Sequence, residues 1–175
     1  MTTLSDVKAY LGITSSDFDD LLQGILDGVV NFIEEYTGRK LSTISLVMDE
    51  YHDEPVRKYV FLEYGPVQSV ALLRLDDAEI SADEFYLDQD LAVITLQSDL
   101  SFRSVHVEYT AGYTSDNFPK GIDYCIKEMC QIFWQARNGR AGVGSITSPV
   151  TSVSGILQEL PPRISTILDL YRIKI

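Results

Sequence analysis

Apolar positions near the start of the chain recur every three or four residues, which is the period of an α-helix. Residues 4–11 carry their apolar side chains on one side of such a helix. Thr3 or Ser5 can supply the N-cap, and Gly12 can end the helix in a left-handed conformation. The pattern therefore predicts a short amphipathic helix at residues 4–11.

A longer apolar stripe runs from Phe18 to Tyr36 and predicts a second helix of about five turns. The sequence SDFD at 16–19 has the pattern of a capping box, with Ser16 as the N-cap and Asp19 reaching back to its amide. Gly38 is the expected stop.

Between residues 42 and 112 the apolar period changes from helical to two, which is typical of β-strands. Six short strands in about 70 residues imply an antiparallel sheet or a small sandwich. We expect an α+β fold, in which 1–175 is a single domain with a helical core of 1–41 and 113–175 and an antiparallel β insertion of about 42–112. The six segments are ISLVMDEYH, RKYVFLEY, VQSVALLRLDD, EFYLD, LAVITLQ and SVHVEYT.

Two more helices are predicted in the last third of the chain. Pro119 suits the first turn of a helix that continues to Gly139, because a proline there loses no hydrogen bond. Pro161 and Pro162 open a short terminal helix in the same way. Between these helices, residues 141–155 are rich in Gly, Ser and Thr, and we expect a flexible loop or a loose hairpin.

The net charge limits which partners the protein can bind. The net charge is −12, and the stretch 42–112 alone carries fourteen acidic and four basic residues. Such a surface cannot bind a phosphate backbone tightly by releasing counterions, so nucleic-acid binding is not expected. No apolar run approaches the length of a membrane span, and the N-terminus lacks the pattern of a signal peptide.

The residues that usually carry catalysis form no recognisable motif. His52 and His106 have no nucleophile pattern around them, and Cys125 and Cys130 are five positions apart on a predicted helix, where they point in different directions. We expect buried, reduced thiols, no cofactor and no catalytic residue. The acidic run 76–90 could in principle hold a hard cation, but it lacks the spacing of a calcium loop, and a charged strand edge is the expected interpretation.

The segment 105–126 has the order strand, glycine turn and helix start, which is also the layout of a phosphate site. It contains no phosphate-binding glycine motif, Asp116 would repel an anion, and Pro119 removes a backbone donor. We therefore interpret it as a structural hinge, with Gly112 in a conformation other residues resist and Tyr109 and Tyr113 packing beside it.

Several passages, in the same order along the chain, resemble the tailed-phage head–tail connector (adaptor) proteins, in the longer branch of that family. The N-terminal helix pair ending in IEEYTGR looks like the opening of these proteins, and GPVQSVALLRLDD is similar to their proline-valine-x-serine-valine strand. VHVEYTAGYTSDNFPKGIDYCIKEMCQIFWQARNG closely resembles their Y-x-A-G-Y turn, proline and long helix. The final ILDLYRIK resembles their terminal leucine-x-x-tyrosine-arginine.

The resemblance implies a structural virion protein without enzymatic activity or metal. Connectors of this family form a ring of subunits, typically a dodecamer, below the portal protein, and DNA passes through the ring without specific binding. The ring links the head to tail-completion proteins in the virion and is assembled in the cytoplasm of the bacterial host. The family's C-terminal segment usually docks onto the portal, which on this chain points to Leu168, Leu170, Tyr171, Arg172 and Ile173.

Two alternatives stay open. The first is another virion component, such as a tail-completion or tail-terminator protein, which also forms rings. A metal-dependent hydrolase using the carboxylates of 76–90 is the less favoured alternative. If the chain forms the ring that the resemblance implies, its acidic charge would let a polyanion slide through without sticking, although the same charge also serves solubility.

Overall fold

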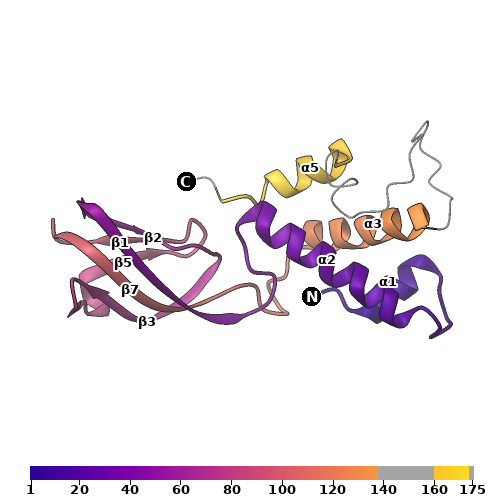
Figure 1. Ribbon diagram of the computed structural model, residues 1–175, viewed down its shortest axis with the longest axis horizontal. Helices are drawn as coiled ribbons and strands as arrows, with labels where there is room; N and C mark the ends of the chain where they lie inside the picture. Colours follow the sequence, from indigo (N-terminus) through magenta and orange to yellow (C-terminus); the bar gives the residue numbers. More distant parts are fainter. Residues whose placement is uncertain (138–159, 174–175) are drawn as a thin grey trace. The chain divides into compact units, whose positions relative to one another are not determined.

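A computed structural model describes residues 1–137 and 160–173, and it divides the chain into two compact units (Figure 1). The helical unit comprises Met1–Tyr36 and Phe118–Tyr171, and the β unit comprises Thr37–Asn117 and Arg172–Ile175. Helices and antiparallel sheets together confirm the predicted α+β class. The single-domain organisation stays a prediction, as do the loop 141–155 and the helix end at Gly139, which lie outside the described residues.

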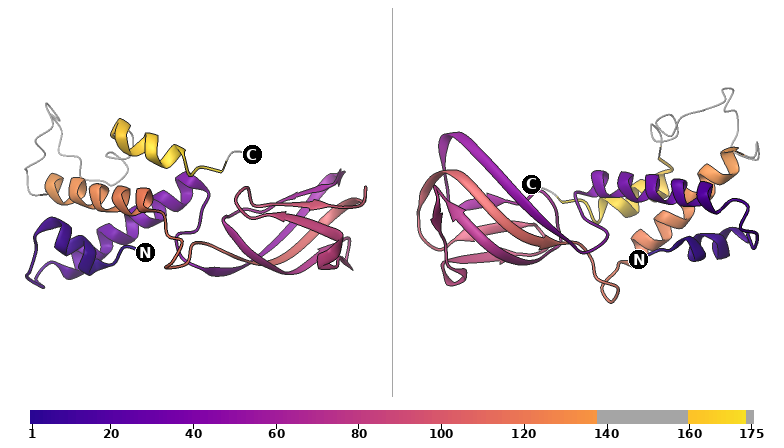
Figure 2. Two further views of the ribbon diagram at one scale, coloured as in Figure 1. Left: turned by 180° about the vertical axis from the view of Figure 1, so that it is seen from behind. Right: turned by 60° about the horizontal axis from the view of Figure 1, so that its bottom comes forward.

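The helical unit contains four described helices: α1 (Leu4–Leu11), α2 (Asp19–Thr37), α3 (Lys120–Arg137) and α5 (Pro162–Asp169). Helix α3 lies beside α5 in both figures, and α1 also packs on α3 (Figures 1 and 2). The apolar stripes of these helices meet in a core that includes both cysteines. The buried residues are Val7, Leu22, Leu26, Val29, Ile33, Ile122, Cys125, Ile126, Met129, Cys130, Ile164 and Leu168.

Thr3, rather than Ser5, caps helix α1. Its hydroxyl accepts a hydrogen bond from the Asp6 backbone N–H at 3.2 Å, and the Asp6 carboxylate accepts one from the Thr3 N–H at 2.8 Å. This reciprocal pair is a capping box, and the bond from Thr3 is the main reason why the pKa of the Asp6 carboxyl is lowered. At the other end Gly12 has φ +69° and closes the helix, as predicted.

Replacing Thr3 with alanine should lower the free energy of unfolding by about 1 kcal/mol, because the α1 terminus loses a side-chain acceptor. Urea denaturation of the full chain measures this difference. Ser5→Ala is the matched control, since Ser5 is exposed and makes no described side-chain hydrogen bond, and it should change stability by less than about 0.5 kcal/mol. Equal effects of the two changes would contradict the assignment of the cap.

The predicted capping box at the start of α2 is wrong. Residues 16–19 form a turn in which the Asp19 N–H donates to the Ser16 carbonyl at 3.1 Å, and the helix begins only at Asp19. The Asp19 carboxylate lies 2.5 Å from the Lys8 ammonium, so an ion pair with α1 has taken the side chain that the box would need. Phe18, in this turn, packs edge-on against Trp134 with ring centroids 5.3 Å apart.

The β unit contains two antiparallel sheets. The four-stranded sheet has the order β1-β7-β3-β4 and the three-stranded sheet the order β2-β6-β5. Strand β4, at the edge of the first sheet, is a short addition to the six predicted strands. The strands are β1 (Ile44–Arg57), β2 (Tyr59–Phe61), β3 (Val67–Leu75), β4 (Ala78–Glu79), β5 (Phe85–Asp88), β6 (Val93–Leu96) and β7 (Ser101–Ala111), with a short 3-10 helix, η1 (Ala82–Glu84), before β5.

The inner faces of the two sheets share one hydrophobic core. From Val105 to Ala111 alternate residues of β7 are buried, which matches the predicted period of two, and the intervening residues form the more exposed face of the strand. Residues from both sheets interdigitate, so the β unit is a small sandwich with its own interior (Figure 2). Its buried residues are Val60, Leu62, Val67, Leu73, Leu75, Ala92, Ile94, Leu96, Phe102, Val105, Val107, Tyr109 and Ala111.

No helix among residues 1–137 and 160–173 is long and apolar enough to cross a membrane.

Candidate functional site

The last turn of α5 and the segment after it carry the residues that the family resemblance implies for docking, and these residues differ in how far they are exposed. Leu168 is fully buried in the helical core together with Ile164. Leu170, two positions later, follows the last turn of α5 and leaves 79% of its surface exposed. Leu170 therefore buries little surface within its own unit and is accessible to a partner.

Tyr171 and Ile173 both contribute to packing. The space beside Gly121 is filled by Tyr171, because a Cβ built on Gly121 would lie 2.8 Å from the tyrosine hydroxyl. Ile173 packs at the margin of the β core, and its backbone N–H donates to the Thr37 carbonyl at 2.9 Å. The side chain of Ile173 lies against Gly38 and Gly65, so it covers the end of the β unit that follows α2 in the sequence.

Two of the five docking residues are therefore exposed. Leu170 and Arg172 are accessible, Tyr171 and Ile173 are partly buried, and Leu168 is in the core. The sequence pattern did not indicate the structural role of Ile173. The available signal was the pair of glycines, Gly38 and Gly65, which leave room for a side chain from a distant part of the chain.

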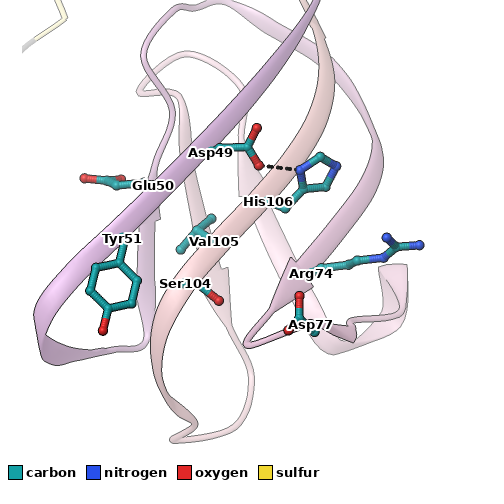
Figure 3. Close-up of a pocket in the computed structure, with 8 residues that line it drawn as sticks. All are labelled: Asp49, Glu50, Tyr51, Arg74, Asp77, Ser104, Val105 and His106. Atoms are coloured by element: carbon teal, nitrogen blue, oxygen red, sulfur yellow. Dashed lines mark hydrogen bonds and ion pairs between the residues drawn. The ribbon is translucent and has the colours of Figure 1, made fainter.

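The outer face of the four-stranded sheet holds a shallow depression of about 260 Å³ (Figure 3). The register places Asp49, His106 and Arg74 side by side across β1, β7 and β3. Figure 3 shows the Asp49 carboxylate directed at the imidazole of His106, with Arg74 projecting separately beyond it. The full lining is Asp49, Glu50, Tyr51, Arg74, Asp77, Ser104, Val105 and His106.

Two carboxylates hold the imidazole of His106. Nδ1 lies 2.6 Å from an Asp49 oxygen, and Nε2 lies 3.5 Å from a Glu108 oxygen. The hydrogen bond to Asp49 is the main cause of a raised pKa of His106, since it favours the protonated ring. The sequence assigned His106 to the polar side of its strand, but the cross-strand carboxylate appears only once the register of β1 and β7 is known.

Replacing Asp49 with asparagine should return the pKa of His106 towards its ordinary value of 6.5, because the strongest partner of the charged ring is lost. NMR titration of the His106 ring protons measures this. Because the folded pKa is the higher one, the ion pair stabilises the fold fully below pH 6.5 and is lost as the pH rises through the folded pKa. Glu50→Gln, which removes a carboxylate from the same strand, should leave the His106 titration unchanged.

The two cysteines and Asp76 have structural surroundings that account for their shifted pKa values. Both cysteine thiols are buried, and burial raises the pKa of Cys125 to about 11 and that of Cys130 to about 12, so they stay protonated at neutral pH. In the acidic run, the Asp76 carboxylate accepts backbone hydrogen bonds from Arg103 and Ser104, which lower its pKa. Among the described residues, no three His, Cys, Asp or Glu side chains come together as a metal site.

The glycine turn after β7 packs closely against the backbone of neighbouring segments. Gly112 has φ +107°, and a Cβ at this position would lie 2.0 Å from the carbonyl oxygen of Ser42. Its N–H donates to the Pro66 carbonyl at 2.8 Å, and its carbonyl accepts from the Gln68 amide at 2.8 Å. Two other chain segments, one at Ser42 and one at Pro66 and Gln68, thus meet this one residue, and its backbone donor and acceptor are both used within the fold.

Comparisons with known proteins give one family match and several matches to solved structures. A family model described as head completion protein matches residues 1–174. The neck of an empty GTA particle computed with C6 symmetry contains a similar chain, with a TM-score of 0.71, 14% identity, and coverage of 99% of this chain and 90% of that one. No curated protein matches.

Two further structures resemble the chain at 16% identity. The neck of a native GTA particle computed with C12 symmetry gives a TM-score of 0.64, with 100% of this chain and 94% of that chain covered. The virion of a native gene transfer agent particle gives 0.61, with 99% and 90% covered. At these identities the similarity demonstrates the fold, and it extends over nearly the whole length of both chains.

Proposed function

The chain belongs to the head completion protein family and is a structural head–tail connector, and we propose that it forms a ring below the portal in the neck of a virion. The observation that carries this proposal is the family match over residues 1–174, which includes both units rather than one module. We further propose that it works without chemistry of its own, as a non-enzymatic component assembled in the host cytoplasm.

The solved relatives favour a ring of copies. Similar chains occur in necks computed with C6 and with C12 symmetry, and both symmetries require several identical subunits around one axis. We propose a dodecamer, because a ring of twelve identical copies is compatible with both C12 and C6 symmetry.

Electrostatics support a conduit rather than a DNA-binding role. Residues 37–117 carry six basic and fifteen acidic residues, a net charge of −9. A ring of such units offers few cations to phosphates, so a passing DNA duplex would meet no backbone contact strong enough to hold it. We propose that DNA moves through the ring without specific binding.

The C-terminal segment is the proposed contact with the portal. Leu170 offers apolar surface and lies two residues before the exposed Arg172, and apolar and arginine side chains are frequent together in interfaces. Leu168 and Ile173 would support this contact from within the two units. At the opposite end of the ring we propose a tail-completion protein as the neighbour.

Electron microscopy of the full chain mixed with purified portal rings from the same phage tests the proposal. We expect a second ring stacked on the portal, with twelve copies of this chain. Binding to tail tubes with no complex on the portal would instead identify a tail-terminator protein and overturn the proposed position.

A further inference from the structure

The outer face of the three-stranded sheet is apolar, although its inner face already forms the core. The register places Tyr59, Thr95 and Tyr86 in one row and Phe61, Val93 and Asp88 in the next. Tyr86 is 66% exposed, and the Tyr59 and Phe61 rings lie 6.4 Å apart with 44% and 46% of their surfaces exposed. We call this surface the aromatic face. Strands that are apolar on both sides are normally covered on both sides.

The outer face of the four-stranded sheet has a different character. Its rows are Val47, Glu108 and Leu72, then Asp49, His106 and Arg74. Val47 is 63% exposed and Tyr51, two rows further along β1, is 68% exposed. We call this surface the arginine face, because within residues 1–137 and 160–173 no hydrogen bond or ion pair involves the Arg74 guanidinium.

A closed ring needs two different surfaces on each subunit, one for each neighbour. The two faces belong to opposite sheets of one sandwich, so both can be occupied at once by different copies. Pairing the aromatic face with itself would stop at a closed dimer. A contact between unlike faces can propagate around a ring.

We propose that the aromatic face of one copy packs on the arginine face of the next copy in the ring, with Arg74 pairing with Asp88 across the contact. This deepens the proposed function and rests on it. Tyrosine, phenylalanine and arginine are enriched in interface centres, and both faces contain exposed apolar side chains, Tyr86 on one and Val47 on the other.

Both faces carry charged side chains of either sign, and Arg74 and Asp88 are the opposite charges that the proposed contact would bring together. On the arginine face, His106 is occupied by Asp49 and Glu108, whereas Arg74 forms no ion pair among the described residues, although Glu79 lies opposite it in the register of β3 and β4. On the aromatic face, Asp88 accepts the Leu91 N–H through Oδ1 at 2.9 Å, and no cation among the described residues pairs with it. Each side chain therefore lacks the partner that the other would supply.

A charge exchange tests the contact. Arg74→Asp and Asp88→Arg should each lower the yield of rings formed on portal rings at least about tenfold, because two like charges then meet at every interface. The double variant, in which the charges are exchanged, should restore ring formation. Counting rings by electron microscopy gives the yield, and thermal melting verifies that every variant is folded. Arg57→Asp is the matched control, since Arg57 lies at the end of β1, 3.6 Å from Asp99, and should leave the yield unchanged.

The outcomes separate this contact from the proposed function. Wild-type chain that forms no ring on the portal would overturn the function and the contact together. Wild-type rings that persist in Arg74→Asp and Asp88→Arg would overturn the contact alone. A folded Asp88→Arg variant that still forms rings but no longer binds the tail-completion protein would overturn it too, by assigning the aromatic face to that protein.

Discussion

Gly112→Ala should lower the free energy of unfolding of the β unit by more than about 3 kcal/mol. The new Cβ would lie 2.0 Å from the Ser42 carbonyl oxygen, and the backbone at φ +107° is one that alanine resists. The nearest atoms are backbone, so no side chain can rotate away to relieve the clash. The turn could accommodate alanine only by breaking the bonds between Gly112, Pro66 and Gln68.

Amide hydrogen exchange in β1 and β7 measures this loss directly, because it reports the opening of the sheet even if the helical unit stays folded. Gly24→Ala is the matched control. Gly24 lies in α2 with nothing within 4 Å of a built Cβ, so alanine there should stabilise the chain by about 0.5–1 kcal/mol. Protection of β7 amides in Gly112→Ala equal to that of the wild type would contradict the role of this glycine.

Leu170→Asp should weaken binding to portal rings by about 30-fold or more, the effect of losing one interface hot spot of about 2 kcal/mol. The change should leave the fold intact, because Leu170 is 79% exposed. Surface plasmon resonance with immobilised portal rings gives the affinity. Deleting residues 169–175 would be a poorer test, since it would also remove Ile173 from the β core.

Leu100→Asp provides the control for Leu170→Asp. It makes the same apolar-to-acid change at another exposed leucine, within the β unit, and should not change the affinity. A Leu170→Asp variant that binds the portal as tightly as the wild type would remove this residue from the proposed docking segment. Leu170→Met, which keeps apolar area, should retain binding.

Local sequence patterns were sufficient to predict the helices and most strands. Gly12 and Gly38 both have φ +69°, as expected of residues that end helices, and Pro162 stands in the first turn of α5. The strands followed from the period of two. These signals depend only on neighbouring residues, so no knowledge of tertiary contacts was needed.

Features that depend on distant residues could not be predicted in the same way. Asp19 pairs with Lys8 of another helix, which changed the start of α2. His106 is held by Asp49 across a strand pair, and the rows of the aromatic face exist only in the observed register. For the docking segment, the family resemblance indicated the residues, but only packing distinguishes exposed Leu170 from buried Leu168.

The way the two units divide the chain determines the order in which they can fold during synthesis. The β unit is nearly complete once residues 37–117 have left the ribosome, whereas the helical unit needs residues 118–171 to cover the stripe of α2. The apolar surfaces of the first two helices therefore stay uncovered during the time in which the β unit is synthesised and folds. A nascent chain stalled after residue 117 should thus be a preferred target for chaperones, which bind such exposed apolar helices.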